Sequence, residues 1–149
     1  NAKERIIAAL QPVDLETLGL EGAVRATIDE LRRRTGLRID ATIDLSDAEP
    51  EPDIAAALLR LLQEALTNAV RHAAADRIDV TLSCRAQRVH VTVVDDGVGF
   101  DPEAPTDGRF GLLGARERVE ALRGALHIDS APGQGTRLSF WLPCAVSQA

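Results

Sequence analysis

The sequence is poor in the residues that mark several protein classes. It has no methionine, one lysine, two cysteines and only 3% aromatic residues. Cys84 and Cys144 lie far apart and outside any zinc-ligand spacing, so we expect thiols in a reducing compartment, and therefore a cytoplasmic location. No apolar run approaches the roughly 18 residues that span a bilayer, and no signal-like leader opens the chain, so we expect no membrane contact. The missing methionine predicts a piece of a longer protein.

The remaining composition is that of a folded globular domain. The 149 residues include 45% hydrophobic and 27% charged residues, which argues against disorder and allows one domain with a real core. Acidic residues exceed basic ones by 23 to 17, so there is no general attraction to nucleic acid. A phosphate ligand would need a local site.

Hydrophobic periodicity predicts alternating helices and strands. We expect helices over 20–34, 53–74 and 115–123, strands over 37–45, 78–83, 88–93, 126–128 and 138–142, and a glycine-rich segment over 95–114. Residues 1–18 are predicted to be a linker or the tail of an upstream helix, 19–146 the domain, and 147–149 a C-terminal tail.

Four polar residues share one face of the predicted helix over 53–74. Glu64, Asn68, Arg71 and His72 are spaced by four and then three or four residues on a helix otherwise built from leucine and alanine. A lone glutamate there would most often be a solvated charge. Together, a carboxylate that can polarise a nucleophile, an amide oxygen for hydrated Mg²⁺ and cations for phosphate are suited to nucleotide chemistry.

Three further segments carry acid or glycine at turns. Asp95 ends a predicted strand and precedes Gly97 and Gly99, so it could accept a hydrogen bond from an adenine amino group. The alternative is a plain loop with glycines at positive φ. Residues 108–114 open a helix, where backbone N–H groups favour anions. Their GxxGxxG spacing and the lack of a parallel βαβ unit exclude a dinucleotide fingerprint. Residues 133–136 are predicted to form a hairpin turn.

In order and spacing, these segments resemble the N, G1 and G2 boxes and the closing GxGT turn of the GHKL ATPases. The matching segments are 63–72, 95–100, 111–119 and 133–136. The resemblance covers 59–143 and is closest to the catalytic domain of NarL-type two-component sensor histidine kinases, with a likeness to actinobacterial haem-sensing dormancy kinases. It implies a Bergerat α/β sandwich in which a mixed, largely antiparallel sheet of about five strands packs under about three helices. ATP would lie between helices and a lid over 101–110.

The resemblance also implies roles for the motif residues. In the N box, Glu64 would assist phosphoryl transfer, Asn68 would coordinate Mg²⁺, and Arg71 and His72 would face the phosphates. The residues implied to bind ATP are the adenine-reading Asp95 with Gly97 and Gly99, the G2 residues Gly111, Leu112 and Gly114, and Thr136 of the GxGT turn.

A kinase domain of this type would transfer the γ-phosphoryl group of ATP to a histidine on a separate dimerisation domain of the same kinase. A response regulator would then take the phosphate. His72 lies in the N box, and His90 and His127 lie in predicted strands, so we expect the acceptor histidine to be absent from this chain. Two alternatives stay open: an anti-sigma-factor-type serine kinase, and a non-enzymatic nucleotide-gated interaction module.

Overall fold

The computed structural model of the chain describes residues 15–45, 48–71, 74–99 and 110–146. Within these ranges the chain forms three helices and seven strands. In chain order they are α2 (Leu15–Thr35), β1 (Arg38–Asp44), β2 (Ala48–Glu49), α3 (Pro52–Arg71), β3 (Arg77–Arg85), β4 (Arg88–Asp95), α4 (Phe110–Ala121), β5 (Ala125–Ser130), β6 (Thr136–Pro143) and β7 (Ala145–Val146).

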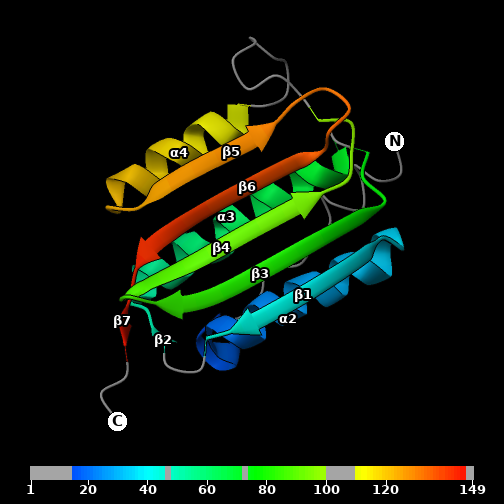
Figure 1. The fold of residues 1–149 in the computed structure, drawn as a ribbon. Helices are drawn as coiled ribbons and strands as arrows, with labels where there is room; N and C mark the ends of the chain where they lie inside the picture. Colours follow the sequence, from blue (N-terminus) through cyan, green and yellow to red (C-terminus); the bar gives the residue numbers. More distant parts are fainter. Residues whose placement is uncertain (1–14, 46–47, 72–73, 100–109, 147–149) are drawn as a thin grey trace.

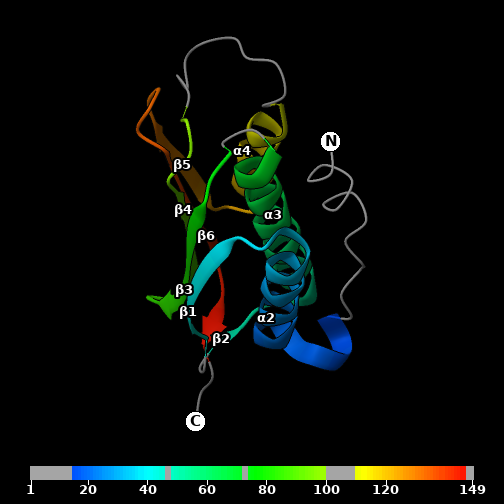
Figure 2. The same cartoon turned by 90° about the vertical axis from the view of Figure 1, so that its right-hand side faces the viewer.

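Five strands make one sheet, and the helices cover one of its faces. The strand order is β1-β3-β4-β6-β5; β1 runs parallel to β3, and the other neighbouring pairs are antiparallel. Figure 2 shows this sheet edge-on with α2, α3 and α4 all on the same side. A second, two-stranded sheet pairs β2 with β7. This two-layer α/β sandwich confirms the predicted fold class.

The core lies between the sheet and the helices because the strands and the helices each turn a regular series of apolar residues toward the other layer. Strands β3, β4 and β6 bury every second residue, while α3 buries residues spaced three and four apart. The buried residues facing each other include Leu58, Leu62, Leu66, Val80, Leu82, Val89, Val91, Val93, Leu138, Phe140 and Leu142. This packing places α3 across the middle of the sheet.

Some predicted boundaries differ from those of the structure. The helix predicted over 115–123 begins at Phe110, so α4 includes glycines that were expected to precede it. The two-residue strands β2 and β7 were not predicted. Helix α2 starts at Leu15, within the range predicted as a linker, and is interrupted at Gly19 by a non-helical φ of 74°. The domain boundaries stay a prediction.

Candidate nucleotide-binding site

Most of the predicted site elements end at one end of the molecule. The last turn of α3, the end of β4, the β5–β6 turn and the first turn of α4 lie at the upper end in Figure 1, and the side view in Figure 2 agrees. Three of the four sequence motifs, which are far apart in the chain, thus lie at the same end of the molecule as the start of the G2 helix. The fold therefore gathers the predicted site residues around a common edge.

Asp95 is a buried acid at the end of a strand. It is 8% exposed, and its Oδ1 accepts a hydrogen bond of 2.9 Å from the Gly97 backbone N–H. Burial raises the pKa of Asp95 above its ordinary value, against the lowering effect of the backbone N–H groups of Gly97 and Thr136. A carboxylate accepts about four hydrogen bonds, so Asp95 retains acceptor capacity for a ligand donor.

The neighbouring Asp96 is exposed, and its carboxylate accepts hydrogen bonds from backbone N–H groups. Its Oδ1 accepts hydrogen bonds from the N–H groups of Asp76 (2.9 Å) and Arg77 (3.0 Å), at the start of β3. These bonds lower the pKa of Asp96. Asp96 therefore joins the end of β4 to the loop after α3, which leaves Asp95 as the candidate for ligand recognition.

The loop after Asp95 and the turn before Thr136 fit together through glycine. Gly99 and Gly135 both have positive φ, 68° and 71°. A Cβ on Gly99 would overlap the Ala131 carbonyl, and one on Gly135 would overlap the Asp95 carbonyl. The Gly133 N–H donates to the Val98 carbonyl at 2.6 Å. Glycine is thus required where the G1 loop touches the GxGT turn.

Thr136 lies directly beside Asp95 in the β4–β6 register. Its Oγ1 is 2.9 Å from the Ser130 Oγ, which also lies within hydrogen-bond distance of the Gly135 carbonyl at 2.9 Å. Ser130 therefore braces the turn that holds Thr136. Ser130 was not among the residues predicted from the sequence, because its pairing with Thr136 follows only from the β5–β6 register.

Glu64 and Asn68 lie half-buried on α3, and Arg71 is exposed at its last turn. The Glu64 carboxylate pairs with the guanidinium of Arg118 on α4. Arg118 was part of the matched G2 segment, but its contact with Glu64 needs the packing of α3 against α4, which a one-dimensional pattern does not show.

Helix α4 begins at Phe110, directly before the G2 segment, so Gly111, Leu112 and Gly114 lie in its first two turns. The first N–H groups of a helix have no intrahelical acceptor and favour anions. This correction of the predicted start places the G2 glycines on the helix itself. His72, Phe100 and the predicted lid over 101–109 lie outside the described residues.

Comparison with known proteins identifies the family of this chain. The family described as "Histidine kinase-, DNA gyrase B-, and HSP90-like ATPase" matches residues 53–146. The chain belongs to this family. It corresponds to the ATP-binding catalytic domain found in sensor histidine kinases, as the resemblance predicted.

Individual proteins similar to this chain are named as histidine kinases. An uncharacterised sensor-like histidine kinase of Chloroflexus aurantiacus is 36% identical over 143 residues, which cover 90% of this chain and 24% of that protein. The histidine-protein kinase/phosphatase DegS of Brevibacillus brevis is 34% identical, over 97% of this chain and 37% of DegS. The chain thus spans well under half of either relative.

A solved structure shares the fold. The histidine kinase domain of a blue-light activated histidine kinase from Erythrobacter litoralis aligns with a TM-score of 0.70 at 24% identity, over 95% of this chain and 68% of that domain. Among the described residues, no helix is both long and apolar enough to cross a membrane. The likeness to NarL-type and haem-sensing kinases stays a prediction.

Proposed function

We propose that this ATPase-family chain binds Mg·ATP and, as part of a sensor histidine kinase, transfers the γ-phosphoryl group to a histidine of a separate dimerisation domain. A response regulator would then receive the phosphate, and the reaction would take place in the cytoplasm. The observation that carries the proposal is the buried Asp95 carboxylate, which lies where the G1 loop and the GxGT turn meet and at the same end of the molecule as the last turn of α3.

Adenine recognition would rest on Asp95. Its carboxylate has no donor of its own when ionised, so it suits the exocyclic amino group of adenine and opposes the carbonyl that guanine carries at the same position. Gly97 and Gly99 keep the neighbouring backbone free of side chains, and Thr136 with its Ser130 brace forms the adjacent wall. Together these features support a preference for ATP over GTP.

The phosphates would lie toward α3 and the start of α4. Arg71 supplies positive charge, the adjacent His72 would add an imidazole N–H donor, and the first turns of α4, with Gly111, Leu112 and Gly114, supply backbone N–H groups. The half-buried Asn68 fits a magnesium ion, which binds through one or two protein oxygens and otherwise keeps waters and phosphate oxygens. When bound there, Mg²⁺ would neutralise phosphate charge.

In the transfer itself, a bond forms between the acceptor imidazole nitrogen and Pγ while the bond from Pγ to the β–γ bridging oxygen breaks, leaving ADP. The chain contributes position and charge rather than covalent chemistry. Glu64, one helical turn before Asn68, is the group proposed to polarise the incoming nucleophile. The relatives named as histidine kinases favour this reaction over serine phosphorylation and over binding without transfer.

Calorimetric titration of the chain with Mg·ATP and with Mg·GTP tests the proposal. We expect heat of binding with ATP and much weaker binding with GTP; equal affinities would contradict adenine recognition by Asp95. In the same assay Asn68→Ala should weaken binding in the presence of Mg²⁺ and change it little in EDTA. Its melting temperature without nucleotide should stay near that of the wild type, because a large fall would make Asn68 a structural amide.

A further inference from the structure

An arginine of the G2 helix holds the proposed catalytic carboxylate. Arg118 lies on α4, and its Nη2 donates a hydrogen bond to the Glu64 Oε2 on α3. The two residues are 54 positions apart in sequence. The nucleotide-binding roles proposed above leave Arg118 unused.

We propose that Arg118 is a positioning residue that fixes the orientation of the Glu64 carboxylate for phosphoryl transfer. This inference rests on the proposed function, because it presupposes that Glu64 polarises the acceptor nucleophile. In this role Arg118 acts through Glu64.

The exposure of the pair argues for positioning rather than for stability. The two side chains are 44% and 32% exposed, and ion pairs of this kind contribute about 0–1 kcal/mol to folding. A groove of about 390 Å³ between α3 and α4, lined in part by Arg60, Leu61 and Arg118, keeps the neighbourhood open to solvent. An unpaired glutamate on such a surface would sample several rotamers, whereas the pair holds one oxygen and leaves Oε1 available.

The position of Arg118 along α4 links this orientation to the nucleotide. Gly114 lies one helical turn before Arg118, within the segment proposed to face the phosphates. A movement of α4 when phosphate binds at its start would therefore carry Arg118 and the Glu64 carboxylate with it. Since transfer depends on geometry within fractions of an ångström, such a link affects the rate more than the affinity.

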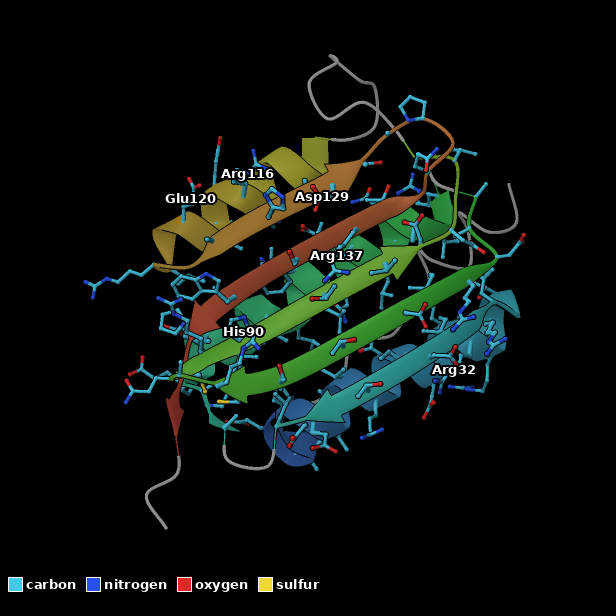
Figure 3. The ribbon with its side chains drawn as sticks, viewed as in Figure 1. Arg32, His90, Arg116, Glu120, Asp129 and Arg137 are labelled. Carbon is cyan, nitrogen blue, oxygen red and sulfur yellow. The ribbon has the colours of Figure 1, made fainter. Side chains whose placement is uncertain are left out.

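The test compares Arg118→Ala, Arg118→Lys and Glu64→Ala, with Arg116→Ala as the matched control. Arg116, labelled in Figure 3, is an exposed arginine two residues earlier on α4, and this helical spacing places it on a different side of the helix from Arg118. Each variant is measured for Mg·ATP affinity by calorimetry and for its rate of phosphoryl transfer to the dimerisation domain of the same kinase added in trans. The Glu64 side-chain carboxyl resonance is followed by ¹³C NMR as a readout that needs no transfer.

We expect Arg118→Ala to slow transfer about tenfold or more with ATP affinity changed less than about threefold, while Arg118→Lys recovers part of the rate and Arg116→Ala behaves as wild type. Adding Arg118→Ala to Glu64→Ala should cause no further loss. Additive losses, or an equal effect of Arg116→Ala, would overturn the inference. Wild-type protein that binds ATP but transfers nothing would instead overturn the proposed function and the role built on it, while an unshifted Glu64 resonance in Arg118→Ala would overturn the pairing alone.

Discussion

Asp95 and Asp96 are adjacent and chemically identical, but the fold gives them different surroundings. Asp95 is buried beside the G1 and GxGT segments, whereas Asp96 is exposed and binds two backbone N–H groups at the start of β3. Spacing alone favoured Asp95 through the resemblance, and the geometry now supplies the physical distinction. The two residues can therefore be separated by experiment.

Asp95→Asn should reduce ATP affinity about ten- to a hundredfold and remove the discrimination against GTP. The amide can turn a donor toward the adenine amino group, and losing a hydrogen bond to a charged group costs about 1.5–3 kcal/mol. Calorimetry with both nucleotides measures the change. Asp96→Asn, which keeps an acceptor oxygen, is the control and should bind ATP nearly as well as wild type; equal losses would refute the assignment of Asp95.

The Asp96 carboxylate should make the free energy of unfolding depend on pH in the acidic range. The N–H groups of Arg77 and Asp76 lower its pKa below the ordinary 3.8, so its contribution to folding is present above that value and is lost as the pH falls through the folded-state pKa. Asp96→Ala should therefore lower the free energy of unfolding at pH 7, and its difference from wild type should shrink as the solution is acidified. Urea unfolding at a series of pH values checks this. A difference that stays constant with pH would show that the charge plays no part.

At the residue scale, helical spacing predicted that Glu64, Asn68 and Arg71 lie on one helix, and α3 carries all three. The partner of Glu64 was not predicted, since Arg118 reaches it from a helix whose crossing of α3 is decided by core packing. Ser130 and Asp96 were missed for the same reason: their partners lie across strands or beyond a loop. Sequence periodicity predicts on which helix or strand a residue lies, but it does not predict which residues of other elements that residue contacts.

At the scale of elements, the strands with clear alternation were predicted well. Strands β3 and β4 join through Ala86 and Gln87, both at positive φ, a two-residue turn that lacks the usual glycine or asparagine. Helix α4 was predicted too short, because glycines in its first turns look like loop residues and contribute no apolar stripe. The paired strands β2 and β7 have two residues each, too few to show any period.

The junction between the G1 loop and the GxGT turn should depend on Gly135 far more than on Gly133. Both have positive φ, but a Cβ on Gly135 would overlap the Asp95 carbonyl, whereas one on Gly133 meets nothing within 4 Å. Gly133→Ala should cost only backbone strain, about 1–2 kcal/mol. Gly135→Ala adds a steric cost of about 1–3 kcal/mol, and so a further fall in melting temperature of about 3–10 °C.

Thermal unfolding of the two variants without nucleotide measures this difference. ATP affinity should also fall in Gly135→Ala, because relief of the overlap displaces the strand end that carries Asp95. Equal melting temperatures for the two variants would show that the end of β4 and the GxGT turn can move apart with no loss of stability. The contact between them would then not be what fixes the position of Asp95.

At the scale of the whole molecule, the sheet separates two faces with different chemistry. The helix-covered face carries the apolar core, and the other face is polar, with Arg137 and Asp129 on neighbouring strands (Figure 3). On the same face, the side chain of Arg88 on β4 lies over the Trp141 ring on the neighbouring strand β6, 3.8 Å from the ring centroid. The histidines in the strands lie on this open face as well.

The chain alone should therefore bind ATP without phosphorylating itself on histidine. Burial, followed by the charges of Arg85 and Arg88, lowers the pKa of His90, a direction that favours the neutral imidazole, which is the form able to attack phosphorus. Its position excludes it: His90 alternates with the buried Val89 and Val91, and thus points away from the helices that carry the N and G2 boxes. His127 is exposed on β5, 3.1 Å from Asp129, and lies on the same open face.

Incubation with labelled Mg·ATP, followed by acid and base treatment, checks this prediction. In-line transfer needs the acceptor nitrogen held close to the γ-phosphate. For His90 and His127 the sheet stands between the imidazole and the proposed nucleotide site, and His72 is proposed to bind phosphate from the N box rather than to act as the acceptor. Adding the dimerisation domain in trans should produce acid-labile, base-stable label on that domain, because phosphohistidine has this stability. Glu64→Ala should then slow labelling more than it weakens ATP binding, since its contribution is realised mainly in the transition state. The same type of label on this chain alone would mean that a histidine reaches the nucleotide from the open face or the N box, and that the separation of the two faces does not govern the reaction.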